Sequence, residues 1–180
     1  MKRPSATLFR LLLSLARHLP SSHIRSWPCR LRVALLRRLV RSCGQGVNVL
    51  PGAYVGYPHN LSIGDNTGIG LNCYLSCADR VTLGSRVLMG PEVMIFTSNH
   101  VWNPELMTYF KQGETTAPVE ILDDAWVGAR SILLPGVTVG RGCTVAAGSV
   151  VVESTPDFSV VAGVPARVLK FKPHSIPKVA

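Results

Sequence analysis

Residues 121–156 read ILDDAW VGARSI LLPGVT VGRGCT VAAGSV VVESTP, and this stretch decides the fold. Each group of six residues begins with an aliphatic residue, and its fifth residue is Ala, Ser, Val, Cys or Thr. The same period runs upstream from Ile63 to His100, interrupted by two inserted residues, Val81 and Thr82. The repeat is too regular to be a coincidence, and internal repeats of this kind define whole folds.

A period of six does not fit an α-helix, which needs apolar residues about every 3.6 positions. It fits a short strand followed by a tight corner, where Gly, Asn and Asp tolerate the backbone that the corner requires. Three such sides close a triangular coil of about 18 residues, and stacked coils bury one continuous aliphatic core. The sequence therefore predicts an all-β parallel β-helix of five or six coils over residues 45–170.

The repeat stops at His100 and resumes nineteen residues later. The intervening segment, 101–119, contains Trp102, Tyr109 and Phe110 but no six-residue period. Long irregular segments in a compact fold are usually functional. We therefore expect a protruding loop at 101–119 that forms a cleft with the neighbouring face.

A histidine in such a cleft is a natural general base, because its unperturbed pKa is about 6.5. Transfer of an acyl group to an alcohol needs such a base to remove the hydroxyl proton. The competing interpretation is a histidine that only packs against the wall of the helix. The other histidines lie in the N-terminal segment, an early turn and the tail: His18, His23, His59 and His174.

The sequence resembles the hexapeptide-repeat O-acetyltransferases, including those that act on galactosides, maltose, exopolysaccharide and lipopolysaccharide. The resemblance rests on the aliphatic-Gly hexads, on SNH at 98–100 and on DDAWVGARSILLPGVTVGRGCTVAAGSVVVESTPDFSVVAGVPARVLK at 123–170. It covers about residues 45–172. It implies a left-handed parallel β-helix, a homotrimer with active sites between subunits, acetyl-CoA as acyl donor and no metal requirement.

The resemblance also implies roles for individual residues, beginning with His100 as the catalytic base. The positions that match coenzyme-binding positions of the family are Ala129, Ala147, Val152, Arg167, Lys170 and Trp126. Arg167 and Lys170 match residues that meet the coenzyme phosphates, although they also fit a solvated C-terminal strand. Trp126 matches a tryptophan that borders the active site, although it also fits simple packing at a corner.

The residues expected to bind the acceptor match family positions less closely. Ser76 aligns with an asparagine that helps to hold the reacting group, and Asp79 aligns approximately with a sugar-binding carboxylate. Asn99 is a nearby amide that could serve instead. Each of the three also fits a surface or corner role. The small helical module of the free-sugar acetyltransferases is not recognisable here, which points away from free sugars.

The charge of the chain is concentrated at its N-terminal end. Residues 1–42 contain ten Lys and Arg and no acid, and the first acid is Asp65. Helices are expected at 8–19 and 27–40, with apolar and Arg-rich faces. They fit either a membrane-surface segment or a cap on the first coil. Nucleic-acid binding is not indicated, because no known module is present.

Three segments are therefore expected: a basic helical segment at 1–44, the acyltransferase β-helix at 45–172 and a tail at 173–180. The predicted activity is acetyl-CoA-dependent O-acetylation of a sugar hydroxyl, in a surface polysaccharide or its lipid-linked precursor. Alternatives are a small hydroxylated acceptor, such as an antibiotic or a serine-like compound, and a non-enzymatic scaffold. The five cysteines fit reduced thiols, and we expect a cytoplasmic protein, free or peripheral on the membrane.

Overall fold

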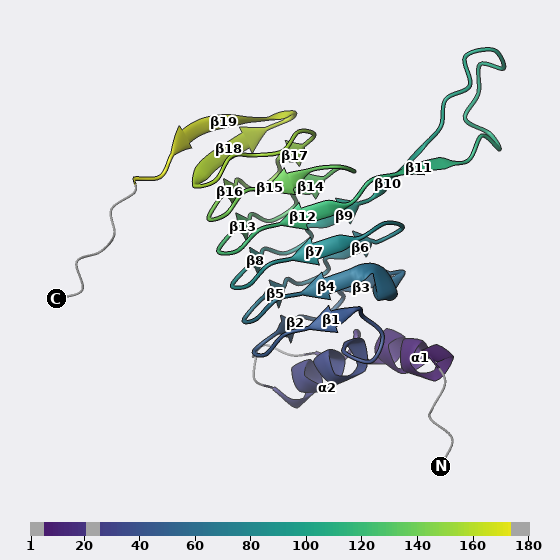
Figure 1. The fold of residues 1–180 in the computed structure, drawn as a ribbon. Helices are drawn as coiled ribbons and strands as arrows, with labels where there is room; N and C mark the ends of the chain where they lie inside the picture. Colours follow the sequence, from purple (N-terminus) through teal and green to yellow (C-terminus); the bar gives the residue numbers. More distant parts are fainter. Residues whose placement is uncertain (1–5, 21–25, 174–180) are drawn as a thin grey trace.

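The computed structural model describes residues 6–20 and 26–173. The described chain forms a stack of β-coils with two helices beneath its N-terminal end (Figure 1). Helix α1 spans Ala6–Ala16 and helix α2 spans Trp27–Leu36, which confirms the two expected helices. The tail expected at 173–180 lies outside the described residues beyond position 173.

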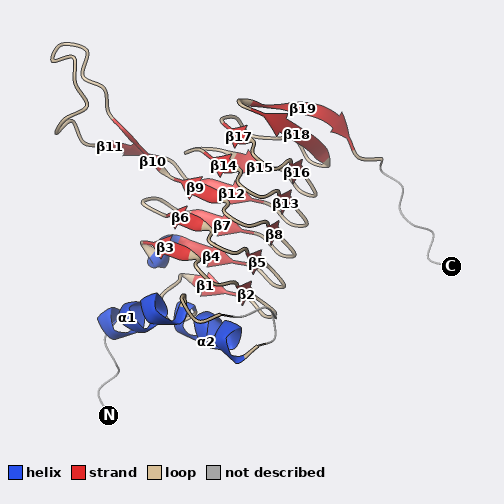
Figure 2. Cartoon of the chain, turned by 180° about the vertical axis from the view of Figure 1, so that it is seen from behind, coloured by secondary structure: helices blue, strands red, loops and turns tan. Residues whose placement is uncertain are grey.

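Each turn of the chain adds one strand to each of three sheets, and Figure 2 shows these strands as stacked arrows. Sheet A contains β1 (Ser42–Cys43), β4 (Leu61–Ile63), β7 (Val81–Leu83), β12 (Val119–Ile121) and β15 (Thr138–Val139). Sheet B contains β2 (Asn48–Val49), β5 (Gly68–Ile69), β8 (Leu88–Met89), β13 (Trp126–Val127), β16 (Thr144–Val145), β18 (Ser159–Gly163) and β19 (Ala166–Phe171). Sheet C contains β3 (Tyr54–Gly56), β6 (Tyr74–Ser76), β9 (Met94–Phe96), β14 (Ile132–Leu133) and β17 (Val150–Val151).

The coils are longer in the N-terminal half than the hexads predict. Ser62 pairs with Ser42 and with Thr82, each 20 residues away, whereas Trp126 pairs with Thr144, 18 residues away. The insertion assigned to Val81 and Thr82 was wrong in position, because both residues belong to β7. The two extra residues instead widen the corner between sheets C and A, at 77–80.

The aliphatic column of the hexads forms the core, as predicted. Ile63, Leu75 and Leu133 are buried, and the small fifth residues lie beside them, with Ser131 and Cys143 fully buried. These short side chains are needed because successive coils approach closely at the corners. The fold class is therefore confirmed as a left-handed parallel β-helix with N-terminal helices.

The two helices close the N-terminal end of the stack. Leu36 belongs to the central core, and Leu13 and Val33 pack against it. Arg32 is buried and donates hydrogen bonds to the backbone oxygens of Val49 (2.8 Å), Leu19 (3.0 Å) and Ala16 (3.3 Å). The guanidinium thus joins α2 to the first coil and to the C-terminal end of α1, whose last carbonyl groups lack helical partners.

The protrusion expected at 101–119 is a β-hairpin that begins and ends slightly earlier, which we call the arm (residues 98–117). Strand β10 (Ser98–His100) pairs antiparallel with β11 (Glu114–Thr116). The arm leaves the stack between β9 and β12 and points away from the two helices (Figures 1 and 2). It therefore projects a short antiparallel ribbon from the stack, whose strands pair in parallel except for β18 with β19.

Candidate active site

His100 lies at the foot of the arm, where β10 has just left the coil. Its partner across the ladder is Glu114. The His100 Nδ1 atom is 3.8 Å from Glu114 Oε1, and the two side chains are 71% and 48% exposed. A carboxylate at this distance needs to move by only about 1 Å to accept a hydrogen bond from the imidazole.

The arm holds its shape through local contacts. The rings of Trp102 and Tyr109 lie 4.8 Å apart between centroids. The Asn103 side-chain oxygen accepts hydrogen bonds from the N–H groups of Glu105 and Leu106. At its foot is an open hollow of about 410 Å³. The residues that line this hollow are His100, Tyr109, Phe110, Lys111, Gly113 and Glu114.

Two acceptor candidates, Ser76 and Asp79, lie in the corner between sheets C and A, directly below the start of the arm. The buried hydroxyl of Thr97 donates to the backbone carbonyl oxygen of Ser76 (2.9 Å) and accepts from the backbone N–H of Asp79 (2.8 Å). Asn99 is exposed on β10 next to His100 and pairs with Thr115. The structure therefore brings these three candidates to the same corner as the histidine.

The coenzyme candidates Ala129 and Ala147 lie on a different corner, between sheets B and C. Gly128, beside Ala129, has no room for a side chain, because a Cβ there would lie 2.5 Å from the Ala147 nitrogen. The Gly148 N–H donates to the Ala129 oxygen (2.8 Å). Within the described residues, no hydrogen bond engages the N–H of Ala129 or Ala147. This corner therefore presents two unused backbone donors, one above the other.

Lys170 and Trp126 belong to one row of sheet B. Trp126 pairs with Thr144, Thr144 with Val160, and Val160 with Lys170. Both Trp126 and Lys170 are exposed. Both residues therefore lie on the exposed face of sheet B, and the strand that holds Trp126 runs into the corner that contains Ala129.

Arg167 and Val152 complete the set of coenzyme candidates. Arg167 is exposed on β19 opposite Ala162, close to the Ala147 corner. Val152 is exposed at the far end of sheet C, one residue after β17. Arg167 therefore joins Trp126, Ala129, Ala147 and Lys170, whereas Val152 does not.

The candidate residues thus form two groups on one chain. His100 and the acceptor candidates lie at the corner between sheets C and A, and most coenzyme candidates lie at the corner between sheets B and C. A side of five residues separates the two corners, which is about 16 Å at the rise of a strand. Within one chain, His100 therefore lies far from the edge that carries Ala129, Ala147, Arg167, Lys170 and Trp126, which we call the donor edge.

Two residues of the site were missed from the sequence, Glu114 and Thr97. Glu114 was missed because the arm was read as an irregular loop, in which no residue has a defined partner. Its only sequence signal is the placement of Trp102 and Tyr109 on either side of the arm tip. Thr97 is the third residue of the hexad that begins at Ile95, a position without an aliphatic preference, and nothing in the sequence indicates that its hydroxyl joins two coils.

Two segments of the chain match models of hexapeptide families. Residues 118–152 match the bacterial transferase hexapeptide (six repeats), and residues 60–90 match the hexapeptide repeat of succinyl-transferase. The chain is 33% identical over 140 residues to the galactoside O-acetyltransferase of Escherichia coli (strain K12), which covers 77% of this chain and 68% of that protein. It is 37% identical over 133 residues to nodulation protein L of Rhizobium meliloti (strain 1021), which covers 74% and 72%.

The fold is similar to that of a hexapeptide-repeat-containing acetyltransferase from Vibrio cholerae O1 biovar eltor, solved in complex with acetyl coenzyme A. The TM-score is 0.77 at 28% identity, over 92% of this chain and 87% of that one. The likeness therefore spans nearly the whole chain and is not confined to the repeats.

Proposed function

The chain belongs to the hexapeptide-repeat O-acetyltransferases, and from this premise we propose that it transfers the acetyl group of acetyl-CoA to a sugar hydroxyl with His100 as general base. The galactoside O-acetyltransferase relative supports a sugar acceptor. The acetyl-CoA complex of the Vibrio cholerae protein supports the donor. The observation that carries the proposal is the exposed His100 opposite Glu114 in a hollow at the foot of the arm.

In the proposed reaction, the His100 imidazole accepts the proton of the acceptor hydroxyl as its oxygen attacks the thioester carbonyl. The tetrahedral intermediate collapses by breaking the carbon–sulfur bond. The departing coenzyme A sulfur then takes the proton from the imidazolium, which restores the base. The products are an O-acetyl ester and free coenzyme A, and general base catalysis of this kind contributes about 10²–10⁴ in rate.

Glu114 is the group that would orient the imidazole. A carboxylate beside Nδ1 favours the tautomer in which Nδ1 carries the hydrogen and Nε2 is free to accept the proton. It also stabilises the imidazolium that forms during the attack. The 3.8 Å separation is compatible with this role, because catalytic hydrogen bonds often tighten only when substrate is bound.

The donor edge would hold acetyl-CoA mainly through its backbone. The unused N–H groups of Ala129 and Ala147 suit the amide carbonyls of the pantetheine arm. Arg167 and Lys170, exposed on β19, supply positive charge for the coenzyme phosphates. Trp126 would border the reacting end of the coenzyme on sheet B. Val152 lies at the other edge of sheet C. It would therefore contact only a coenzyme A molecule that is bound by the donor edge of a neighbouring chain.

We place the two groups in one site through a homotrimer. In a three-fold assembly, the donor edge of one subunit can face the His100 corner of its neighbour. The separation of the two groups by a full side of the coil supports this arrangement. The exposed aromatic residues Tyr109 (57%) and Phe110 (74%) of the arm would then pack over the adjacent subunit.

The acceptor we favour is a sugar of a surface polysaccharide or of its lipid-linked precursor. Ser76, Asp79 and Asn99 offer the hydroxyl, carboxylate and amide groups that hold sugar hydroxyls. The hollow beside His100 is open, which suits one residue of a longer glycan. Such precursors are assembled at the cytoplasmic membrane face, where acetyl-CoA is available. We therefore expect the enzyme in the cytoplasm or peripheral on that membrane. Among the described residues, no helix has the length and apolar character to cross a bilayer.

The test is thiol release from acetyl-CoA with a panel of sugars and membrane glycan extract, comparing wild type with His100→Ala. We expect the rate of the variant to fall by about 10²–10⁴, while its affinity for coenzyme A, measured by calorimetry, stays the same. Retained activity in His100→Ala would remove the histidine from the mechanism. If wild type neither binds coenzyme A nor releases thiol, the transferase assignment fails and a scaffold takes its place.

A further inference from the structure

Helix α1 turns an apolar stripe away from the coils. Leu8, Leu11, Leu12 and Leu15 follow the spacing i, i+3, i+4 and i+7, which places them on one side of a helix. Leu11, Leu12 and Leu15 are 58%, 39% and 62% exposed. Leu13, which points the other way, packs against the core. A surface helix ordinarily buries such a stripe against its own domain, so this face is presented to something outside the described chain.

Helix α2 extends the same apolar surface. Trp27 is 67% exposed and Leu31, one turn later, is 38% exposed. The two helices also enclose an apolar groove of about 190 Å³. The groove is lined by Leu12, Leu15, Ala16, Leu19, Leu31 and Leu35. We call α1, α2 and their flanking residues (6–20 and 26–41) the helical cap.

The helical cap also carries exposed positive charge. Arg10, Arg30, Arg38 and Arg41 are exposed. Across the described ranges, each ion pair involves residues outside the cap. No acid occurs before Asp65 in the sequence. The cap therefore joins exposed leucines to arginines without any acidic partner of its own.

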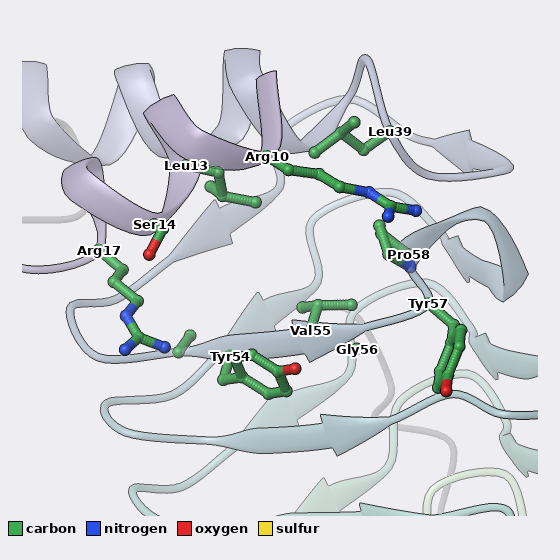
Figure 3. Close-up of a pocket in the computed structure, with 11 residues that line it drawn as sticks. Arg10, Leu13, Ser14, Arg17, Leu39, Tyr54, Val55, Gly56, Tyr57 and Pro58 are labelled. Atoms are coloured by element: carbon green, nitrogen blue, oxygen red, sulfur yellow. The ribbon is translucent and has the colours of Figure 1, made fainter. Parts of the chain in front are cut away.

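A cavity lies between α1 and the coils, on the side of the helix opposite the exposed leucines. It has a volume of about 230 Å³, and Arg10 and Arg17 line it together with Tyr54 and Tyr57. Figure 3 shows Arg10 extending across this cavity toward Pro58, and Arg17 above the ring of Tyr54. The Arg17 guanidinium carbon is 5.8 Å from the centre of that ring. These two arginines face the coils, so the charges placed to meet a bilayer together with the leucines are those of Arg30, Arg38 and Arg41.

We propose that the helical cap is a docking surface for a bilayer that contains anionic lipids. The exposed leucines and Trp27 enter the interface, and the arginines meet lipid phosphates. A second copy of the chain is a poor occupant of this face, because two caps would bring like charges together. The buried Arg32 fixes the helices to the first coil, so docking orients the whole stack.

The geometry has a consequence for the acceptor, which rests on the proposed function. In a three-fold assembly of parallel stacks, all three caps lie at one end, so that weak anchors act together. His100 leaves the stack two coils above β3, about 10 Å at the spacing of paired strands. Because the helical cap lies between the coils and the membrane, the proposed base would act on a sugar held beyond the cap, as in a lipid-linked glycan.

The experiment is sedimentation of the full chain with vesicles of phosphatidylcholine alone or mixed with phosphatidylglycerol. We expect binding to the mixed vesicles that weakens at high salt. The variant Leu11→Glu/Leu15→Glu should lose at least about tenfold in affinity, since each leucine no longer enters the interface. Neutralising Arg30, Arg38 and Arg41 to Gln should weaken binding to mixed vesicles by about fivefold for each charge.

The matched control is Leu106→Glu/Met107→Glu, which changes two equally exposed apolar residues in the arm (66% and 73%). This variant should bind vesicles like wild type. Equal binding by the Leu11/Leu15 variant, or no binding of wild type to mixed vesicles, overturns the proposal. A change of oligomeric state in that variant without vesicle binding would assign the face to a second copy. Thiol release with a soluble acceptor is measured separately, so failure of docking and failure of the transferase are distinguished.

Discussion

In the coils, strands pair in parallel with strands of the neighbouring coil, whereas in the arm residues 98–100 pair antiparallel with residues 114–116 of the same hairpin. The coils bury a continuous aliphatic column, and Leu75 and Ile95 are fully buried. The arm buries little, and Phe110 is 74% exposed. The comparison teaches that the stack supplies a packed core that positions His100, while the arm exposes aromatic side chains for the subunit contact that we propose.

The largest expected effect is on stability, from a truncation in the coils. Ile95→Ala should lower the free energy of unfolding by about 2–5 kcal/mol, because it leaves a cavity between stacked sheets. Phe110→Ala in the arm should change it by no more than about 0.5 kcal/mol in a separated subunit. Denaturant unfolding at one protein concentration measures both variants. A similar loss for the two would show that the arm is part of the folded core.

The next effect concerns the pair at the junction of the two regions. Glu114→Gln should lower kcat by about ten- to hundredfold, because the variant lacks the carboxylate charge that we propose orients and stabilises the His100 imidazolium. The KM for acetyl-CoA should stay the same, since the donor edge lies on another corner. Glu105→Gln, which changes another exposed carboxylate of the arm, is the control and should leave kcat unchanged. A Glu114→Gln variant with normal kcat would remove Glu114 from the orienting role.

The smallest effect concerns the cysteines, which all lie outside the arm. Burial raises the pKa of Cys77 to about 12 and that of Cys73 to about 11. At mildly alkaline pH, both thiols therefore stay protonated and should resist iodoacetamide in the native protein. Cys43 is half-buried and should react first, as measured by mass spectrometry of intact and digested protein. Rapid labelling of Cys77 would show that the coils open.

The sequence was most informative where the fold is periodic. The hexads from Ile121 onward predicted the β-helix because every aliphatic position meets the same core. The arm was predicted only as an interruption, because its pairing of His100 with Glu114 depends on polar residues without a period. Ser76 and Asp79 could be placed near His100 only by family likeness, since Thr97, which ties their corner together, has no distinctive signal.

The division of the site between two corners also escaped the sequence. Ala129 follows the strand that holds Trp126, but only the stacking of sheets shows that it lies a full side away from His100. Similarly, the basic helices could not be assigned as cap or membrane surface from their residues alone. Leu13 and Leu15 differ by two positions, and the structure places them on opposite sides of α1.

The measurement that tests the account most directly is complementation between subunits. His100→Ala and Ala147→Trp chains are each expected to be inactive, the first without its base and the second with a blocked donor edge. Co-expressed with different tags and purified through both, they should form mixed trimers in which one subunit's intact His100 meets another's intact Ala147. We predict that thiol release returns in this mixture. Mixed trimers that form but stay inactive would contradict a site built from two subunits.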